Sequence, residues 1–282
     1  MRCLCSLLCT GFFFIWFGAS GKAQNAEPIA ETILQRMTET YAGFSSYQDS
    51  GVVRRVPSDL PIANFSEPSL QTVAMQAEEL VSFRTYYSRR NKLRFEWMNS
   101  KQKVSRQSVL WFDGRRAYLW KPAEPDSGSF EFTSHRDFGL QLDDAISPSL
   151  GSAFFIPTLL VKGSATSHGF PDILSTATHV SIAREELIDG ELCYVVKAEL
   201  LDVPWLLWIG KKSLLLRKTR TLYSARVFDP SNRIPRQAIM AEEIHTNIKI
   251  NRGVPKGYFI FRPKLRPQDD DSTRQVYPKP RS

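Results

Sequence analysis

Apolar and polar residues alternate along much of this 282-residue chain, which is the pattern of strands with one buried face. The clearest example lies within His179–Tyr223, where Asp189 and Gly190 separate two extended runs. An Asp-Gly pair readily takes the positive φ angles of a tight turn, so this stretch predicts a β-hairpin. After the turn, one face of the strand carries Leu192, Tyr194, Val196, Ala198 and Leu200, and the other carries Cys193, Lys197 and Glu199.

Two more strands are predicted in the same stretch. We expect Pro204 to break the run, so that a third strand covers Trp205–Ile209 and turns through Gly210–Lys212 into a fourth at Leu214–Leu222. Short turns between consecutive strands favour antiparallel pairing, because parallel pairing needs long crossovers. The whole stretch therefore predicts an antiparallel meander.

A second meander is predicted at Glu79–Trp120, with another Asp-Gly turn at Asp113 and Gly114. Further strands are expected at 45–56, 130–133, 237–250 and 258–261. A helix is predicted at Pro28–Tyr41, with an apolar stripe of Ile29, Ile33, Met37 and Tyr41, and one or two short helices within 137–161. This order favours a mainly β (α+β) fold, a large curved antiparallel sheet with helices laid on one face, over alternating β/α units.

The two ends of the chain are expected to lie outside this fold. Arg2 precedes an apolar run, Leu4–Phe17, whose 14 residues are too short to span a bilayer comfortably, and small residues follow. We expect a signal peptide at 1–23, cut after Ala23 or alternatively after Ala19, and an uncleaved membrane anchor is the other interpretation. A single domain is then predicted at 24–262, and the polar segment 263–282 predicts a disordered tail.

Charge and cysteine content narrow the classes of function. The net charge falls from +8 to +6 once Arg2 and Lys22 are removed, and basic residues are interleaved with acidic ones. This pattern is typical of a solvated surface, and we expect no binding to nucleic acid. Three of the four cysteines belong to the predicted signal peptide, so the mature chain has no internal disulfide. Cys193 is expected to be a small buried hydrophobic residue, and a reactive thiol is the alternative.

The sequence carries no motif of a known catalytic or metal site. It has no G-x-S-x-G turn, no glycine-rich phosphate loop and no H-E-x-x-H. Its histidines are isolated from one another and from cysteine, so we expect no metal, no catalytic residues and no cofactor. We therefore predict that the protein is not an enzyme, and polar groups converging on a pocket around His135 or His245 would reverse that prediction.

Aromatic residues make up 12% of the chain, and some strands are apolar on both faces. In Val109–Phe112 and Trp205–Ile209 neither face is polar, which indicates strands covered on both sides. One cover could be a cavity for an apolar ligand, and ordinary packing on both sides is the alternative. The apolar segment Phe154–Leu160, broken by Pro157, is either a lid or a core helix. The candidate cavity residues are Trp97, Trp111, Trp120, Phe154, Phe155, Leu159 and Trp208.

The succession of motifs resembles the outer-membrane lipoprotein-carrier (LolA-like) superfamily of periplasmic proteins. Each motif is loose, and the resemblance lies in their order and spacing from about Pro28 to Pro263. After the signal peptide and first helix come Ser46–Gly51, Lys92–Glu96, Trp111–Gly114, Glu186–Tyr194 and Leu207–Lys212.

The resemblance implies an incomplete antiparallel β-barrel with short helices on its concave face, which binds acyl chains of lipoproteins or lipids and is not an enzyme. The expected protein is a carrier or sensor, secreted across the inner membrane into the periplasm and associated with membranes peripherally at most. Its expected partner is a lipid or an acylated protein. No arginine here can be matched to the one that accepts the acyl group in the carrier. The alternative is an envelope interaction or signalling module with a solidly packed core and an envelope protein as its partner.

Overall fold

The computed structural model describes residues 29–56, 77–100, 107–122, 130–135, 138, 142, 155–161, 174, 176–200, 203–224 and 238–260. The predicted signal peptide (1–23), the predicted tail (263–282) and the candidate cavity residue Phe154 lie outside these ranges. The described ranges cover the sheet, the first helix and part of the connection between the two meanders.

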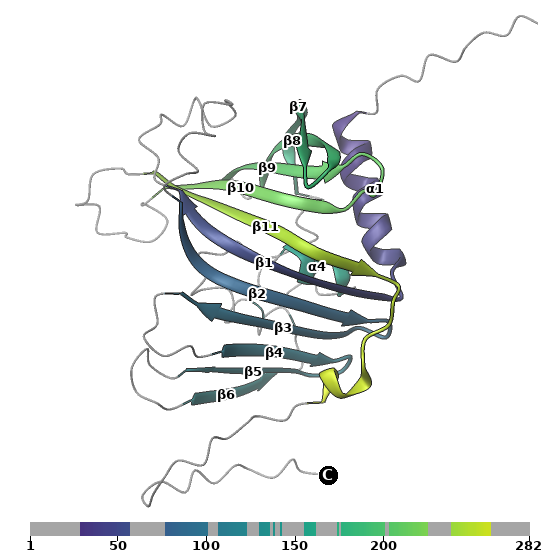
Figure 1. Ribbon diagram of the computed structural model, residues 1–282, viewed down its shortest axis with the longest axis vertical. Coiled ribbons are helices and arrows are strands. Elements are labelled where there is room, and N and C mark those ends of the chain that lie inside the picture. Colours follow the sequence, from purple (N-terminus) through teal and green to yellow (C-terminus); the bar gives the residue numbers. More distant parts are fainter. Residues whose placement is uncertain are drawn as a thin grey trace, which may run out of the picture.

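One open sheet of eleven strands dominates the structure (Figure 1). Its strands are β1 (Ser46–Val56), β2 (Glu78–Ser88), β3 (Lys92–Asn99), β4 (Gln107–Asp113), β5 (Ala117–Pro122), β6 (Phe130–His135), β7 (Thr178–Ile188), β8 (Glu191–Leu200), β9 (Val203–Gly210), β10 (Leu216–Ser224) and β11 (Ala238–Ile250). They lie in the order β6-β5-β4-β3-β2-β1-β11-β10-β9-β8-β7, and every neighbouring pair is antiparallel. The two edge strands do not pair with each other, so the sheet forms an incomplete barrel, as the sequence predicts.

Strands β1 and β11, the first and last that the structure describes, pair with each other at the centre of the sheet. This β1–β11 seam joins the meander β1–β6 to the meander β7–β11. Strands β6 and β7 are consecutive in the chain but lie at opposite edges, so the connection between them has to cross the sheet. That connection contains α4 (Phe155–Leu160), which packs against β2 and against α1 (Ala30–Gly43), behind the central strands in Figure 1.

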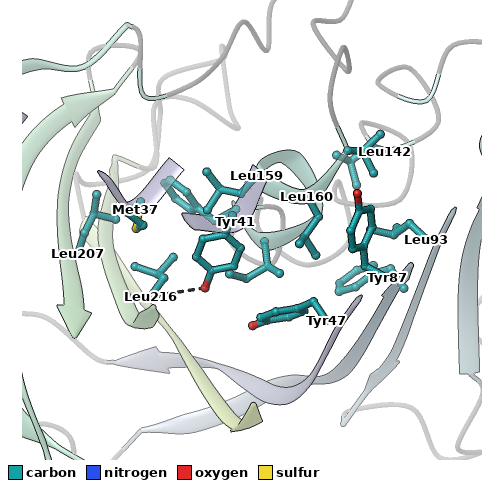
Figure 2. Packing of buried hydrophobic residues seen from close by; sticks show 14 of the residues in the cluster. Met37, Tyr41, Tyr47, Tyr87, Leu93, Leu142, Leu159, Leu160, Leu207 and Leu216 are labelled. Carbon is teal, nitrogen blue, oxygen red and sulfur yellow. Dashed lines mark hydrogen bonds between the residues drawn. The ribbon is translucent and has the colours of Figure 1, made fainter. Parts of the chain in front are cut away.

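Helix α1 packs one stripe of its surface into the curve of the sheet. The stripe has helical spacing and consists of Ala30, Ile33, Leu34, Met37 and Tyr41. The sequence pattern also places Ile29 there, but Ile29 precedes the helix and is 65% exposed. Tyr41 reaches across to β10, where its hydroxyl accepts a hydrogen bond from the backbone N–H of Leu216 at 3.2 Å (Figure 2).

The sheet buries apolar side chains on both of its faces. Figure 2 shows part of the larger cluster, on the concave face, where side chains such as Met37 and Leu159 point toward Leu207 and its neighbours. The smaller cluster lies on the outer face and consists of Cys193, Val195, Leu206, Trp208 and Met240. Residues of β9 alternate between the two clusters, which confirms that this strand is covered on both sides.

Turn geometry confirms both Asp-Gly hairpins. Asp189 and Gly190 have φ angles of 47° and 79°, so both central residues of the turn are left-handed, as a two-residue hairpin requires. In the other hairpin Gly114 has a φ of 94°. There the Oδ1 atom of Asp113 accepts hydrogen bonds from the backbone N–H groups of Arg115 and Arg116, at 2.8 and 2.9 Å.

Two of the predicted strand boundaries are wrong. Pro204 does not precede the third strand but is the second residue of β9, opposite Glu199 of β8. Proline is tolerated there because it removes a donor only from the start of the strand. The segment 258–261, predicted as a strand, instead begins inside the short 3-10 helix η5 (Lys256–Phe259), and the ring of Tyr258 packs on that of Tyr86 in β2, with 4.7 Å between centroids.

Close packing explains why residue 51, in the middle of β1, is a glycine. A Cβ atom on Gly51 would lie 2.3 Å from the ring of Phe83 and 2.3 Å from the backbone oxygen of Ile244. The ring of Phe83 in turn packs edge-on against His245, with 5.4 Å between centroids. The absence of a side chain on Gly51 therefore lets an aromatic ring lie directly over the backbone at the seam.

Replacing Gly51 with alanine should destabilise the fold by about 2 kcal/mol or more, since the strand or the ring has to move, as in other overpacked cores. Urea denaturation followed by circular dichroism measures this loss. Gly43→Ala is the matched control, because nothing lies within 4 Å of a Cβ atom there and alanine suits a helix better than glycine. Equal midpoints for Gly51→Ala and the unchanged protein would contradict the packing at the seam.

Candidate functional site on the concave face

Three of the candidate cavity residues lie on the concave face. Directly paired residues of neighbouring strands share a face, and Trp97 pairs with Phe83 of the concave cluster. Phe155 and Leu159 belong to α4 and to the same cluster. The structure therefore brings Trp97, Phe155 and Leu159 to one side of the sheet, and all three are buried.

The other described candidates, Trp111, Trp120 and Trp208, face the outside of the curve. Trp111 and Trp120 each follow a residue of the concave cluster in their strands, so alternation points them outward. Trp208 belongs to the outer cluster. The sequence pattern could not separate the faces here, because apolar residues alternate with apolar residues in these strands. We therefore place the candidate site on the concave residues alone.

Four polar residues are buried in the middle of the concave face. We refer to Asp49 of β1, Thr85 of β2, and Glu243 and His245 of β11 as the polar cluster. Asp49 is 5% exposed and the other three are fully buried. Buried polar groups of this kind have to be satisfied by partners or serve a purpose, because burial without a partner is costly.

A β-bulge brings Asp49 into the polar cluster. The register between β1 and β11 shifts between Gln48 and Ser50, so that Asp49 has no direct partner on β11. On the opposite strand, Asn247 adopts a φ of 54°, which is unusual for a residue other than glycine. Bulges re-aim side chains and are frequent beside functional sites. This one directs the carboxyl group of Asp49 toward His245 across the seam.

Three donors surround the carboxyl group of Asp49. Its Oδ2 atom accepts a hydrogen bond from the hydroxyl of Tyr47 at 2.9 Å and lies 2.8 Å from Nδ1 of His245. Its Oδ1 atom accepts a hydrogen bond from the backbone N–H of Thr85 at 3.2 Å. Because a carboxylate oxygen only accepts, Nδ1 of His245 is the donor. The imidazole is thereby held with its Nε2 atom toward Glu243.

His245 lies between two carboxyl groups, but only one of them is hydrogen-bonded to it. Its Nε2 atom is 3.2 Å from Oε1 of Glu243, an ion-pair distance whose geometry is not that of a hydrogen bond. Among the described residues, Nε2 of His245, Oε1 of Glu243 and the hydroxyl of Thr85 have no hydrogen-bond partner. The other oxygen of Glu243 accepts only a long bond, 3.5 Å, from Thr219. These three buried atoms therefore make no hydrogen bond to the described residues, and two of them, Nε2 of His245 and Oε1 of Glu243, are held together as an ion pair.

Burial and neighbouring charges shift the pKa values of the polar cluster. Burial alone lowers the pKa of His245, but the charge of Glu243 and the hydrogen bond to Asp49 outweigh it and raise that pKa to about 9. Burial raises the pKa of Glu243, against the opposing effect of His245. Burial, followed by the charge of Asp49, also raises the pKa of Tyr47. The imidazole is therefore protonated at neutral pH, whereas burial opposes the ionisation of Glu243.

The arrangement of the polar cluster does not suit a metal ion. The two carboxyl groups approach opposite nitrogens of the His245 ring, so the three groups do not converge on one point. Within the described ranges, no group of three or more His, Cys, Asp or Glu residues could hold a metal ion.

Sequence reasoning singled out only His245 from the polar cluster. The available signal was spacing: Glu243 and His245 are two residues apart in a predicted strand, as are Tyr47 and Asp49, so each pair shares a face. The missing information was that the first and last strands of the chain are neighbours, which brings the two pairs together.

The outer face holds a separate network of buried charges around Trp208. The charged groups of Lys218, Arg220 and Arg184 lie 4.6, 5.4 and 5.8 Å from the centre of the Trp208 ring. Glu242 pairs with Arg220 and, at 2.9 Å, with Lys218. Burial opposes the ionisation of Glu242, but these two cations outweigh it and lower its pKa. Trp208 is therefore part of a structural ion network.

Trp111 and Cys193 also have structural explanations on the outer face. The guanidinium of Arg94 lies 4.8 Å from the centre of the Trp111 ring and also contacts Glu96. Cys193 is buried, as predicted, and burial raises the pKa of its thiol to about 11. The thiol is therefore protonated at neutral pH, which makes it unreactive.

Comparison with known proteins gives matches of fold. No protein-family model matches the sequence, and no curated protein matches it. The chain is similar in fold to a LolA superfamily protein from Nitrosomonas europaea, with 13% sequence identity, a TM-score of 0.33 and coverage of 83% of this chain and 98% of that chain. LolA-like structures are thus among its matches, as the sequence resemblance predicts.

Two further solved structures are similar to the chain. One is the lipoprotein LppX from Mycobacterium tuberculosis, with 12% identity, a TM-score of 0.41 and coverage of 80% of this chain and 97% of that chain. The other is the MucA/MucB complex of Pseudomonas aeruginosa, with 9% identity, a TM-score of 0.41 and coverage of 82% of this chain and 60% of that chain.

Within the described ranges, no helix combines the length and the apolar character that crossing a membrane requires.

The stability of the fold should fall as pH rises from 6.5 to 9. The folded-state pKa of His245, about 9, is above the ordinary value of 6.5, so its stabilising contribution is complete below pH 6.5 and is lost as pH rises through 9. Since one pKa unit corresponds to about 1.4 kcal/mol, the loss is on the order of a few kcal/mol. Urea midpoints measured at successive pH values test this.

A histidine variant identifies the source of this pH dependence. His245→Gln should remove most of the slope, although it lowers stability at every pH. His179→Gln is the control, because that side chain is 80% exposed, and it should keep the slope. If the urea midpoint of the protein without substitutions stays constant or rises between pH 6.5 and 9, His245 is not the charged member of the polar cluster.

Removing the charge of Glu242 should cost about 3 kcal/mol, because the buried cations of Lys218 and Arg220 lose their shared counter-charge. The free energy of unfolding of Glu242→Gln measures this cost. Glu185→Gln is the matched control, because the ion pair between Glu185 and Lys211, at 2.5 Å, is partly exposed and worth less than about 1 kcal/mol. Equal losses in the two variants would contradict a buried network around Trp208.

Proposed function

We propose that the protein is a non-enzymatic periplasmic carrier or sensor that binds an apolar ligand, a lipid or the acyl chain of a lipoprotein, on the concave face of its sheet. The observation that supports this function best is the chemistry of that face. From β2 to β5 it carries buried aromatic and aliphatic side chains on successive strands: Phe83, Phe95, Trp97, Leu110 and Leu119.

The described helices are small relative to the face that they cover. Helix α1 has 14 residues and α4 has 6, so their lengths are about 21 Å and about 9 Å. Eleven strands have ten spacings, so at about 4.8 Å each the sheet measures about 48 Å along its curve. The concave face is therefore long enough to take an extended acyl chain along its curve. Each buried CH₂ group of such a ligand contributes about 0.8 kcal/mol to binding.

Helix α4 is the element best suited to admit a ligand. A helix of six residues is not stable on its own, so its position depends on the packing of its apolar side chains. Phe155, for example, meets the ring of Trp205 edge-on, with 4.9 Å between centroids. An acyl chain offers the same kind of contact, so it can replace these interactions at little net cost. In this function α4 acts as the lid over the site.

The alternative is an envelope interaction or signalling module with a solidly packed core. The observation that favours it is the near-complete burial of the concave side chains, Trp97 at 4% exposed and Phe155 at 0% among them. In that case the concave face only stabilises the fold, and an envelope protein binds elsewhere. The two functions make opposite predictions about the effect of lipid.

The proposed function predicts that the chain lacking residues 1–23 binds a fluorescent fatty-acid analogue, and that protein purified from its host carries lipid detectable by native mass spectrometry. Trp97→Ala should weaken binding of the analogue by about tenfold, because it removes a large apolar contact on the concave face. Trp120→Ala, on the outer face of the neighbouring region of the sheet, is the matched control and should change binding less than twofold.

Absence of co-purified lipid together with no fluorescence change on adding the analogue would rule out the carrier. Equal effects of the two tryptophan variants would place the ligand elsewhere. Affinity capture from envelope extract, with and without residues 263–282, tests the alternative, which predicts a protein partner whose retention does not change when lipid is added.

A further inference from the structure

We propose that the polar cluster is the site that holds the head group of the ligand, and that this head group is uncharged and carries both a hydrogen-bond donor and an acceptor, as an amide or a hydroxyl does. This inference rests on the proposed function, because it concerns the polar end of the same amphiphile. It adds a specificity that an apolar surface alone cannot provide.

The unsatisfied atoms of the polar cluster define the site. Nε2 of His245, Oε1 of Glu243 and the hydroxyl of Thr85 are all buried, and none makes a hydrogen bond to the described residues, although Nε2 and Oε1 lie 3.2 Å apart as an ion pair. All three belong to side chains on the concave side, because Thr85 pairs with Asp49 and His245 pairs with Gly51. Protein interiors rarely leave such atoms unpaired, and a ligand group that pairs with them removes the penalty.

The local backbone is specialised to hold these residues in place. The register shift at Asp49 and the left-handed conformation of Asn247 interrupt an otherwise regular seam beside His245. Gly51 leaves room for the ring of Phe83, which packs against His245. Departures of this kind from regular strand geometry persist where a side chain has to be aimed.

The charges of the polar cluster select an uncharged head group. The imidazolium of His245 and the carboxylate of Asp49 neutralise each other at 2.8 Å. Burial favours the neutral form of Glu243, whose pKa is raised. A phosphate or carboxylate brought here would add an uncompensated negative charge in a buried site, which is unfavourable. A neutral amide or hydroxyl can accept from Nε2–H of His245 and donate to Oε1 of Glu243 without adding charge.

The register of the sheet gives the direction of the attached chain. Thr85 of the polar cluster pairs with Phe95, which pairs with Leu110, which pairs with Leu119. These residues form one row across the strands on the concave face. An acyl chain attached to a head group at the polar cluster would run along this row, over the apolar side chains that support the proposed function.

A series of ligands with the same chain tests the inference. Hexadecanamide, hexadecanol, hexadecanoate and hexadecyl phosphate are each used at pH 7.5 to displace the fluorescent fatty-acid analogue from the full mature chain. The amide and the alcohol should bind at least about tenfold more tightly than the carboxylate and the phosphate. Equal affinities, or tighter binding of the two anions, would overturn the inference and leave the proposed function standing. Failure of the analogue and of all four ligands to bind would overturn both.

Two conservative variants assign the preference to the polar cluster. Thr85→Val and Glu243→Gln should each reduce the ratio of amide to carboxylate affinity by at least about threefold, while binding of a head group-free alkane, hexadecane, changes less than twofold. Thr221→Val is the matched control, a buried threonine on the same face whose hydroxyl already donates to the carbonyl of Pro204. An unchanged ratio in both variants, once thermal melting has shown that they fold, would overturn the assignment. If neither variant folds, the ligand series measured with the protein without substitutions decides whether the inference stands.

Discussion

The pairing of β1 with β11 is the interaction on which the rest of the structure depends. Among the described residues it is the only ladder that joins the two meanders, and it connects segments almost 200 residues apart in sequence, as in the 196-residue separation of Asp49 and His245. The buried ion pair between those residues lies across this seam, next to the position where Gly51 allows Phe83 to cover the backbone. Backbone pairing, ring packing and charge pairing therefore all occur at one place. A disturbance there would affect both the integrity of the sheet and the centre of its concave face.

The two faces of the sheet bury charge for different purposes. On the outer face, each buried group around Trp208 has a partner of opposite charge, and Glu242 neutralises two cations at once. The charges of that network are paired within the protein, although Nε1 of Trp208 makes no hydrogen bond to the described residues, and the network explains why Trp208 is structural. On the concave face the polar cluster is incomplete, because three of its buried atoms are left without hydrogen bonds by the described residues. An apolar surface with an unsatisfied polar centre is the chemistry that an amphiphile complements.

Local patterns in the sequence predict most of this fold. Alternation and the turn at Asp189 and Gly190 identify the strands, because each depends only on residues close in sequence. The start of β9 is predicted wrongly because Pro204 suggests a break, whereas the ladder tolerates a proline at the start of a strand. The outward orientation of Trp111 cannot be predicted from the sequence, because β4 carries apolar residues on both faces. The polar cluster cannot be predicted from the sequence either, because it forms only when β1 pairs with β11.

The most direct test of the account is to locate a bound chain in the folded protein. A hexadecanamide that carries a diazirine near the end of its chain can be photoactivated in complex with the mature protein, and the labelled peptides identified by mass spectrometry. We expect labelling of concave residues on β4 and β5, Leu110 and Leu119 among them, which unmodified hexadecanamide suppresses. Labelling confined to the outer face around Trp208, or labelling that excess ligand does not reduce, would contradict it.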